Sequence, residues 1–284
     1  MLTIPGLEPI DLLIIGHFTK DITPQGPVLG GTAAYSARTA QALGLRVGVV
    51  TAWAEDVDHS LLDLPDLTVV NDSSDQTTTF ENLETAKGRV QTVQPIAPSL
   101  DYYHVPQLWR EAPYVHIAPV LHEVNPAIAR NFPDAETLLT PQGWLRQWSS
   151  KGEVDCAEWP EARYILRQVT AAVISEEDVR CNLEVIKDLA EAAPILVVTL
   201  GENGARLYQD GDEILVDAPE TKSVDTTGAG DIFATAFFVR YCQTQDAREA
   251  VQFANQVAAD SITRPGLAGA PSKKDISNLI IEVE

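Results

Sequence analysis

The chain has 284 residues, of which 45% are hydrophobic, and its formal net charge is −21. This length and apolar content suffice for the core of one large α/β domain. The negative charge argues against nucleic acid and against an anionic membrane as partners, because both would be repelled. Three cysteines form no CxxC pair, and the N-terminus has no basic segment before an apolar span. A reduced, cytoplasmic protein is therefore expected.

The N-terminal part of the chain predicts a βαβ unit. Residues 11–17 form a short apolar run that ends near a glycine, which is typical of a buried parallel strand. Residues 30–44 combine small residues with helical Ala/Leu spacing and a glycine stop, and 46–53 read as the next strand. A strand, a helix and a strand within about forty residues imply a parallel sheet.

Residues 67–97 differ in composition and pattern from the segments around them. They are polar, rich in threonine and alternating, with "AKG" (86–88) as a hairpin turn. We expect a small antiparallel sheet that stands off the main core and covers a cleft.

Short apolar runs typical of parallel strands follow, and we expect strands at 114–120, 136–140, 171–175 and 194–201. We also expect a hairpin at 204–218 and a long helix at 247–266. In open parallel α/β sheets, ligands bind beyond the carboxyl ends of the strands. The polar residues that follow these strands are therefore expected to line one cleft.

The stretch "DTTGAGDIFATAFF" (225–238) points to chemistry. Apolar residues at helical spacing follow the second aspartate, so a buried helix is expected to begin here. Gly228 and Gly230 would let an anion approach the unpaired amides and the positive end of the helix dipole. A cap alone explains Asp225 but not Asp231, which would lie beside that anion. An anion cradle with a nearby base suggests phosphoryl transfer.

At this point the sequence resembles the PfkB, or ribokinase-like, carbohydrate kinases over nearly the full chain. "DTTGAGD" resembles the C-terminal signature of that family, "LGG" (29–31) its N-terminal signature, and "VVTLGENGARLY" (197–208) its nucleotide-side strand and turn. The resemblance implies a doubly wound, mostly parallel sheet with helices on both faces and a small β-sheet lid. We expect one domain over 1–284, with segments 21–30 and 67–97 forming the lid.

The resemblance also implies roles for individual residues. Asp231 matches the catalytic base, and the amides of Gly228, Ala229 and Gly230 match the anion hole; Thr199, Gly201 and Asn255 match ATP contacts; Asp21, with Gly30 and Gly31, matches the sugar-binding segment; Asp225 and Thr227 match part of a monovalent-cation site.

Two positions depart from the family pattern. Tyr35 stands where the family usually has Asn, and the magnesium-associated Asn-x-x-Glu appears as Ser175-x-x-Asp178. Asp178 is therefore expected to reach Mg²⁺ only through water. "QTTTFENLE" (76–84), "PQGWLR" (141–146) and the aromatic at 35 look most like the myo-inositol kinase branch. This adds Thr78, Gln142 and Arg146 as candidates for the substrate wall, where a solvated loop is an equal alternative for the last two.

The expected function is an ATP-dependent kinase that phosphorylates a small polyol or sugar with Mg²⁺, and K⁺ is a further candidate cofactor. A nucleoside kinase of the same fold stays open, because Phe80 could stack a base if it faces the cleft with Thr78. A kinase-fold protein that has lost activity and serves as a binding or regulatory subunit also stays open. A dinucleotide oxidoreductase is disfavoured, because no GxGxxG follows the first strand. A homodimer through the lid is a further hypothesis.

Overall fold

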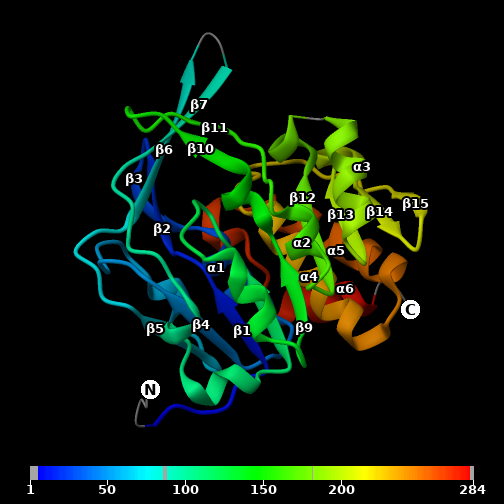
Figure 1. The fold of residues 1–284 in the computed structure, drawn as a ribbon, viewed down its shortest axis with the longest axis horizontal. Coiled ribbons are helices and arrows are strands. Elements are labelled where there is room, and N and C mark those ends of the chain that lie inside the picture. The colour runs from blue at the N-terminus through cyan, green and yellow to red at the C-terminus, as the bar shows by residue number, and fades with distance from the viewer. Residues whose placement is uncertain (1–5, 86–87, 181, 282–284) are drawn as a thin grey trace.

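A large mixed sheet forms the centre of the molecule (Figure 1). The structure, a computed structural model, describes residues 6–85, 88–180 and 182–281. Within them the main sheet has nine strands in the order β15-β14-β13-β12-β9-β8-β1-β4-β5. All neighbours pair in parallel except β13-β14 and β14-β15. The strands are β1 (Leu12–Ile15), β4 (Val47–Thr51), β5 (Leu67–Asn71), β8 (Tyr114–Ile117), β9 (Glu136–Leu139), β12 (Ala171–Ser175), β13 (Ile195–Thr199), β14 (Ala205–Gln209) and β15 (Asp212–Val216).

Helices cover both faces of this sheet, as the apolar runs of its central strands require. Leu12 and Ile14 of β1 face one apolar cluster, which contains α1, α4, α5 and α6. Leu13 and Ile15 face a second cluster, which contains α2, α3 and several 3₁₀ helices. The α-helices are α1 (Thr32–Ala42), α2 (Ala162–Leu166), α3 (Leu183–Ala192), α4 (Ala229–Thr244), α5 (Ala247–Ser261) and α6 (Lys273–Ile281). The predicted doubly wound architecture is confirmed.

Short 3₁₀ helices occupy most of the connections on the second face and at the carboxyl ends of the strands. They are η1 (Ser60–Leu62), η2 (Tyr102–His104), η3 (Gln107–Glu111), η4 (Pro126–Asn131), η5 (Pro141–Leu145), η6 (Glu176–Val179), η7 (Gly201–Asn203) and η8 (Gly266–Gly269). No helix in the described part of the chain is long and apolar enough to cross a membrane.

A second, four-stranded sheet stands off the main sheet as a lid (Figure 1). Its order is β3-β2-β6-β7, from β2 (Thr19–Thr23), β3 (Gly26–Gly30), β6 (Thr78–Thr85) and β7 (Gly88–Val93). A two-stranded ribbon, β10 (Arg146–Trp148) with β11 (Val154–Cys156), lies beside it. The expected assignment of 67–97 to the lid is wrong at its start, because β5 pairs with β4 as the edge of the main sheet. Of the predicted turn at 86–88, Ala86 and Lys87 lie outside the described residues.

The base of the lid is tied to the body by buried hydrogen bonds. His17, directly after β1, contacts the Thr78 hydroxyl through Nδ1 at 2.9 Å and the Pro98 carbonyl through Nε2 at 2.8 Å. The Thr78 hydroxyl also accepts from the Ala97 amide at 3.0 Å. Nearby, the buried Glu123 carboxylate accepts from the amide of His17. The lid therefore leaves the body from a fixed point.

Candidate active site

The glycine-rich turn at 225–230 leads into α4 with the geometry that an anion cradle needs. Gly228 caps the helix in the left-handed conformation (φ 77°), and its carbonyl accepts the first helical bond from Ile232 at 2.9 Å. The Ala229 amide donates to the Thr226 carbonyl at 3.2 Å, which closes the turn. A Cβ on Gly230 would meet only open space. The turn therefore presents an open backbone face at the positive end of the α4 dipole.

Asp231 lies in the first turn of α4, beside this open face. Burial raises the pKa of Asp231 to about 6, and the nearby charges of Asp178 and Asp21 act in the same direction. A hydrogen bond from Thr32 and the charge of Arg146 lower the pKa of Asp231. A carboxylate with a pKa near 6 is ionised at neutral pH and still accepts a proton readily, as a general base must.

Asp21 and the two glycines of "LGG" explain one another. Asp21 lies on β2 directly opposite Val28 of β3, and its Oδ1 accepts from the Thr19 hydroxyl at 2.9 Å. A Cβ on Gly30 would overlap the Asp21 carboxylate. Gly31 has φ 89°, and a Cβ there would lie 2.6 Å from the His17 carbonyl oxygen. The glycines thus make room for Asp21 and allow the sharp entry into α1.

Tyr35 connects the acceptor side of the cleft with the cradle. Its side chain is 3% exposed, and a Cβ on Gly228 would overlap its ring. Burial, followed by the charges of Asp21, Asp231 and Asp225, raises the pKa of Tyr35. The phenol is therefore a neutral group among carboxylates, able to donate a hydrogen bond.

Arg146 and Phe80 close the opposite wall. The Arg146 guanidinium lies over the Phe80 ring, 5.5 Å from its centroid, and Nη1 donates to the Val120 carbonyl at 3.0 Å. Phe80 is buried and packs with Val93, Val120 and Leu121. Because Asp21 and Phe80 are partners in β2 and β6, their side chains share the face of the lid that looks into the cleft.

Asp178 has its own partners within the site. Its Oδ2 accepts from the Ser175 amide at 2.9 Å, in a capping box at the start of η6, and its Oδ1 accepts from Gln142 Nε2 at 3.2 Å. Burial raises the pKa of Asp178. No group of three or more His, Cys, Asp or Glu side chains arranged for a metal ion occurs in the part of the chain that the structure describes. This donor set suits contact with Mg²⁺ through water better than direct coordination.

The candidate cation residues lie on the loop before the cradle. Asp225 Oδ1 accepts from the Thr227 amide at 2.9 Å, and Oδ2 accepts from the Gly266 amide at 2.7 Å. Asp225 thereby links the cradle turn to the segment after α5.

The candidate nucleotide residues lie on β13, η7 and α5. Thr199 ends β13, and Gly201 begins η7 with φ 58°, where an added Cβ would meet open space. Asn255 on α5 is 4% exposed, and its Nδ2 donates to the carbonyls of Val216 at 3.0 Å and Asp217 at 3.2 Å. Asn255 therefore fixes the loop after β15 to α5, and only its carbonyl oxygen remains for a ligand.

The family model for pfkB family carbohydrate kinases matches residues 155–274, which include α4 and the whole cradle. The match assigns residues 155–274 to the pfkB carbohydrate kinase family. Inositol 3-kinase of Oryza sativa subsp. japonica is 25% identical over 292 residues, covering 93% of this chain and 71% of the relative. Ribokinase of Bacillus subtilis is 33% identical over 100 residues, which cover 35% of this chain and 34% of the relative. The match to that ribokinase thus spans about a third of its length.

Solved structures show the same fold at low sequence identity. A pyrophosphate-dependent kinase of the ribokinase family, complexed with a pyrophosphate analog and myo-inositol, has a TM-score of 0.78 at 20% identity and covers 94% of this chain and 99% of its own. Ribokinase of Arabidopsis thaliana, complexed with ribose and ATP, has a TM-score of 0.71 at 18% identity, with 96% and 99% covered.

The candidate site contains residues that sequence reasoning did not assign. Thr32 bonds the base, and its only signal was its place directly after Gly30 and Gly31. Phe80 was weighed only as a surface for a nucleoside base, yet it supports Arg146. Thr78 was expected on the substrate wall, but its fully buried hydroxyl bonds His17 and Ala97. Thr78 is therefore described better as an anchor of the lid.

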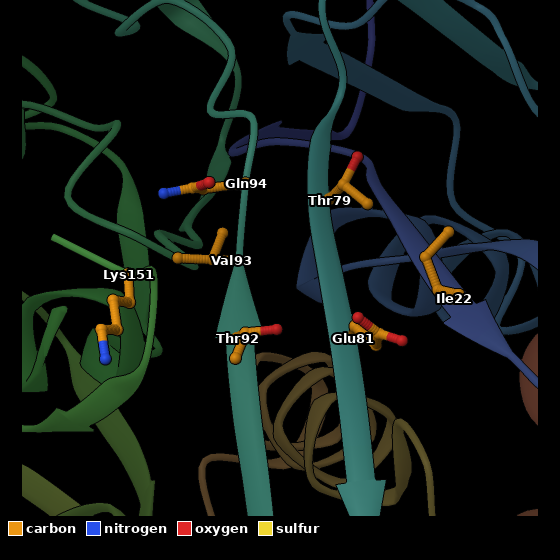
Figure 2. A pocket seen from close by; sticks show the side chains of 7 residues that line it. All are labelled: Ile22, Thr79, Glu81, Thr92, Val93, Gln94 and Lys151. Atoms are coloured by element: carbon orange, nitrogen blue, oxygen red, sulfur yellow. The ribbon is translucent and has the colours of Figure 1, made fainter. Parts of the chain in front are cut away.

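A cavity of about 230 Å³ lies on the lid, and its lining side chains are drawn in Figure 2. It is lined by Ile22, Thr79, Glu81, Thr92, Val93, Gln94 and Lys151. Thr79 and Glu81 alternate along β6 with Phe80, so they lie on the face of the lid turned away from the cleft. This cavity is therefore separate from the candidate active site.

Proposed function

We propose that the protein is an ATP-dependent kinase that phosphorylates one hydroxyl of a small polyol or sugar, with a myo-inositol-like ring as the preferred acceptor. The observation that carries this proposal is the placement of Asp231. It lies at the N-terminus of α4, beside an open backbone cradle and within the field of Asp21.

The reaction would use these residues in fixed roles. Asp21 accepts hydrogen bonds from two hydroxyls of the acceptor and places a third hydroxyl beside Asp231. Asp231 takes the proton of that hydroxyl while its oxygen attacks the terminal phosphorus of ATP, and the bond from phosphorus to the ADP oxygen breaks. The backbone at Gly228 and Gly230 stabilises the charge on the transferring group. Mg²⁺ bound to the phosphates would neutralise part of their charge, with Asp178 in contact through water.

The cleft supports a compact polar acceptor over a nucleoside. Phe80 does face the cleft, which is the arrangement under which a base could stack on it. However, the Arg146 guanidinium lies over its ring, and the ring packs against Val120 and Leu121. Tyr35 fills the space over the cradle with a ring and a phenol. Hydrogen-bonding groups of this kind reject analogues that lack a hydroxyl.

A panel of acceptors and donors tests the proposal. kcat/KM is measured for myo-inositol, ribose, fructose, adenosine and cytidine by a coupled assay of ADP release. Each acceptor is also tested with pyrophosphate by following phosphate release, because a structural neighbour is described as pyrophosphate-dependent. We expect myo-inositol with ATP to lead, and a nucleoside ahead of every polyol would contradict the acceptor.

The alternative of an inactive regulatory protein makes a different prediction for the same panel. It predicts no transfer with any pair, together with binding of ATP or acceptor that Asp231→Asn leaves intact. A homodimer through the lid is a separate proposal, which sedimentation of the full chain tests.

A further inference from the structure

Arg146 occupies an unusual position for a cation in a chain with this much negative charge. It begins β10, directly after η5, and its own carbonyl accepts from His122 Nε2 at 2.6 Å. Its guanidinium is held from two sides, by the Phe80 ring of the lid and by the Val120 carbonyl after β8. The bond of Nη1 to a carbonyl leaves the positive charge of the group uncancelled by that contact.

Four carboxylates act on the charge of Arg146. Burial lowers the pKa of Arg146, whereas the carboxylates around it raise it; these are Asp178, Asp231, Glu123 and Asp21. They come from four elements or loops that the chain brings together only on folding. A guanidinium does not lose its proton under such conditions, so the charge persists in the cleft.

We propose that Arg146 is a positioning residue that the lid holds beside the catalytic base. Through the contact of Phe80 with the Arg146 guanidinium, the ionisation of Asp231 then depends on the position of the lid. This proposal rests on the function proposed above, because it assigns Asp231 as the base.

The physical argument follows from what surrounds Asp231. The groups whose charge or hydrogen bond acts on the ionisation of Asp231, or on which Asp231 acts, include Thr32 and Tyr35 from α1, Asp21 from β2, Asp178 from η6 and Arg146 from β10. Two of these are carboxylates that disfavour its ionised form, and Arg146 is the cation that favours it. Without that cation, Asp231 would be protonated over more of the neutral pH range and could not accept a proton.

The position of the lid matters because Phe80, one of the two groups that hold the Arg146 guanidinium, belongs to the lid. Phe80 is a residue of β6, and the ribbon that carries Arg146 is bonded to β7 of the lid, because the Val93 amide donates to the Gly152 carbonyl at 2.8 Å and Thr92 pairs with Glu153. Val120, which accepts from Arg146, belongs to the body. A lid displaced from the cleft would carry the ring and the ribbon with it, and would draw the guanidinium away from the Val120 carbonyl and from Asp231. The base would then be fully active only with the lid in place over an acceptor.

The first test is the pH dependence of kcat for Arg146→Gln, with Arg163→Gln on the exposed face of α2 as the matched control. A nearby opposite charge shifts a carboxyl pKa by about one unit or more. The ratio of wild-type kcat to that of Arg146→Gln should therefore grow as the pH falls, by about tenfold between pH 8.5 and pH 5. A ratio that is the same at every pH overturns the proposal, because a merely structural or substrate-binding arginine lowers kcat uniformly.

Two more variants separate the charge from the lid contact. Arg146→Lys keeps the charge, so its acid limb should lie between those of the wild type and Arg146→Gln. Phe80→Leu keeps the packing and removes the ring face, so it should shift the acid limb in the same direction as Arg146→Gln, and add no shift in the Arg146→Gln background. Ile22→Leu, on the outer face of the lid, is its control (Figure 2). Fully additive shifts would overturn the role of Phe80.

A measurement without turnover separates this inference from the proposed function. Carbon-13 labelling of the aspartate carboxyls allows the titration of Asp231 to be followed by NMR, with Asp231→Asn identifying its signal. A higher pKa of Asp231 in Arg146→Gln supports the inference even if no acceptor is phosphorylated. An unchanged pKa of Asp231 overturns it even if the wild type proves to be an active kinase.

Discussion

Replacing Gly228 and Gly230 by alanine, one at a time, separates two demands on the same turn. Gly228 has φ 77°, a conformation that costs an alanine about 1–2 kcal/mol. Its new Cβ would also overlap the buried Tyr35 ring, and overpacking of this kind costs about 1–3 kcal/mol. Gly228→Ala should therefore lower the free energy of unfolding by about 2–5 kcal/mol, or the Tm by roughly 4–10 °C at this chain length.

Gly230→Ala should keep the stability of the protein and lower its activity. Gly230 lies inside the first turn of α4, where a Cβ meets open space and alanine is the better helix former. Its stability should stay within about 1 kcal/mol of the wild type. Its kcat should fall at least about tenfold, because the methyl group enters the space that we assign to the transferring phosphoryl group.

Thermal unfolding and steady-state kinetics on both variants decide the matter. The double variant Gly228→Ala with Tyr35→Asn should lose less stability than the two single effects predict, since the overlap is gone and only the backbone strain remains. A Gly230→Ala enzyme with wild-type kcat would refute the location of the cradle. A Gly228→Ala protein as stable as the wild type would refute the reasoning on the turn.

Further predictions concern ionisation, the lid and the metal. Asp231→Asn should lower kcat at least about 10²-fold with nearly unchanged ATP binding. The folded-state pKa of Asp231, about 6, lies above the ordinary 3.8, so ionisation of Asp231 destabilises the fold as the pH rises through this range. The free energy of unfolding of Asp231→Asn, measured by denaturant titration, should therefore exceed that of the wild type by up to about 3 kcal/mol at pH 8, with no gain near pH 4. Burial lowers the pKa of His116 to about 3, so the free energy of unfolding of the wild type should fall by about 2 kcal/mol relative to that of His116→Gln between pH 7.5 and pH 5. A difference between the two proteins that is the same at both pH values would contradict this. Thr78→Val should cost about 1–3 kcal/mol, because it leaves Nδ1 of buried His17 and the Ala97 amide without their partner, and hydrogen exchange should rise in β6 rather than in β1. Asp178→Ala should raise the Mg²⁺ concentration for half-maximal rate modestly, and loss of all activity at saturating Mg²⁺ would make Asp178 a direct ligand.

The sequence predicted the main sheet and the turn before α4 well, because both depend on local signals. Buried parallel strands are continuous apolar runs, and a glycine in the left-handed conformation before a helix is visible in "TGAGD" itself. β5 was misassigned because "LTVVND" is an edge strand whose residues are partly or fully exposed, so it resembled the polar lid segment that follows it.

Contacts between distant segments could not be predicted from the sequence. Arg146 and Phe80 are separated by 66 positions, and nothing local to either shows that one lies over the other. Thr78 was placed on the substrate wall because threonine hydroxyls suit a polar acceptor, but His17 takes that hydroxyl first. The side of the lid on which the Phe80 side chain lies depends on strand register, which is set by the pairing of β2 with β6.

The contact between Gly30 and Asp21 constrains how this cleft can diversify under selection. The carboxylate occupies the space that a side chain at position 30 would need, so any larger residue there requires a simultaneous change at position 21. Single substitutions at either position would be poor starting points, and a path through both would cross a barely functional intermediate. Laboratory evolution toward a new acceptor should therefore accumulate changes first at Gln142, whose partner is the side chain of Asp178. Asp21 and Gly30 should change late, and together.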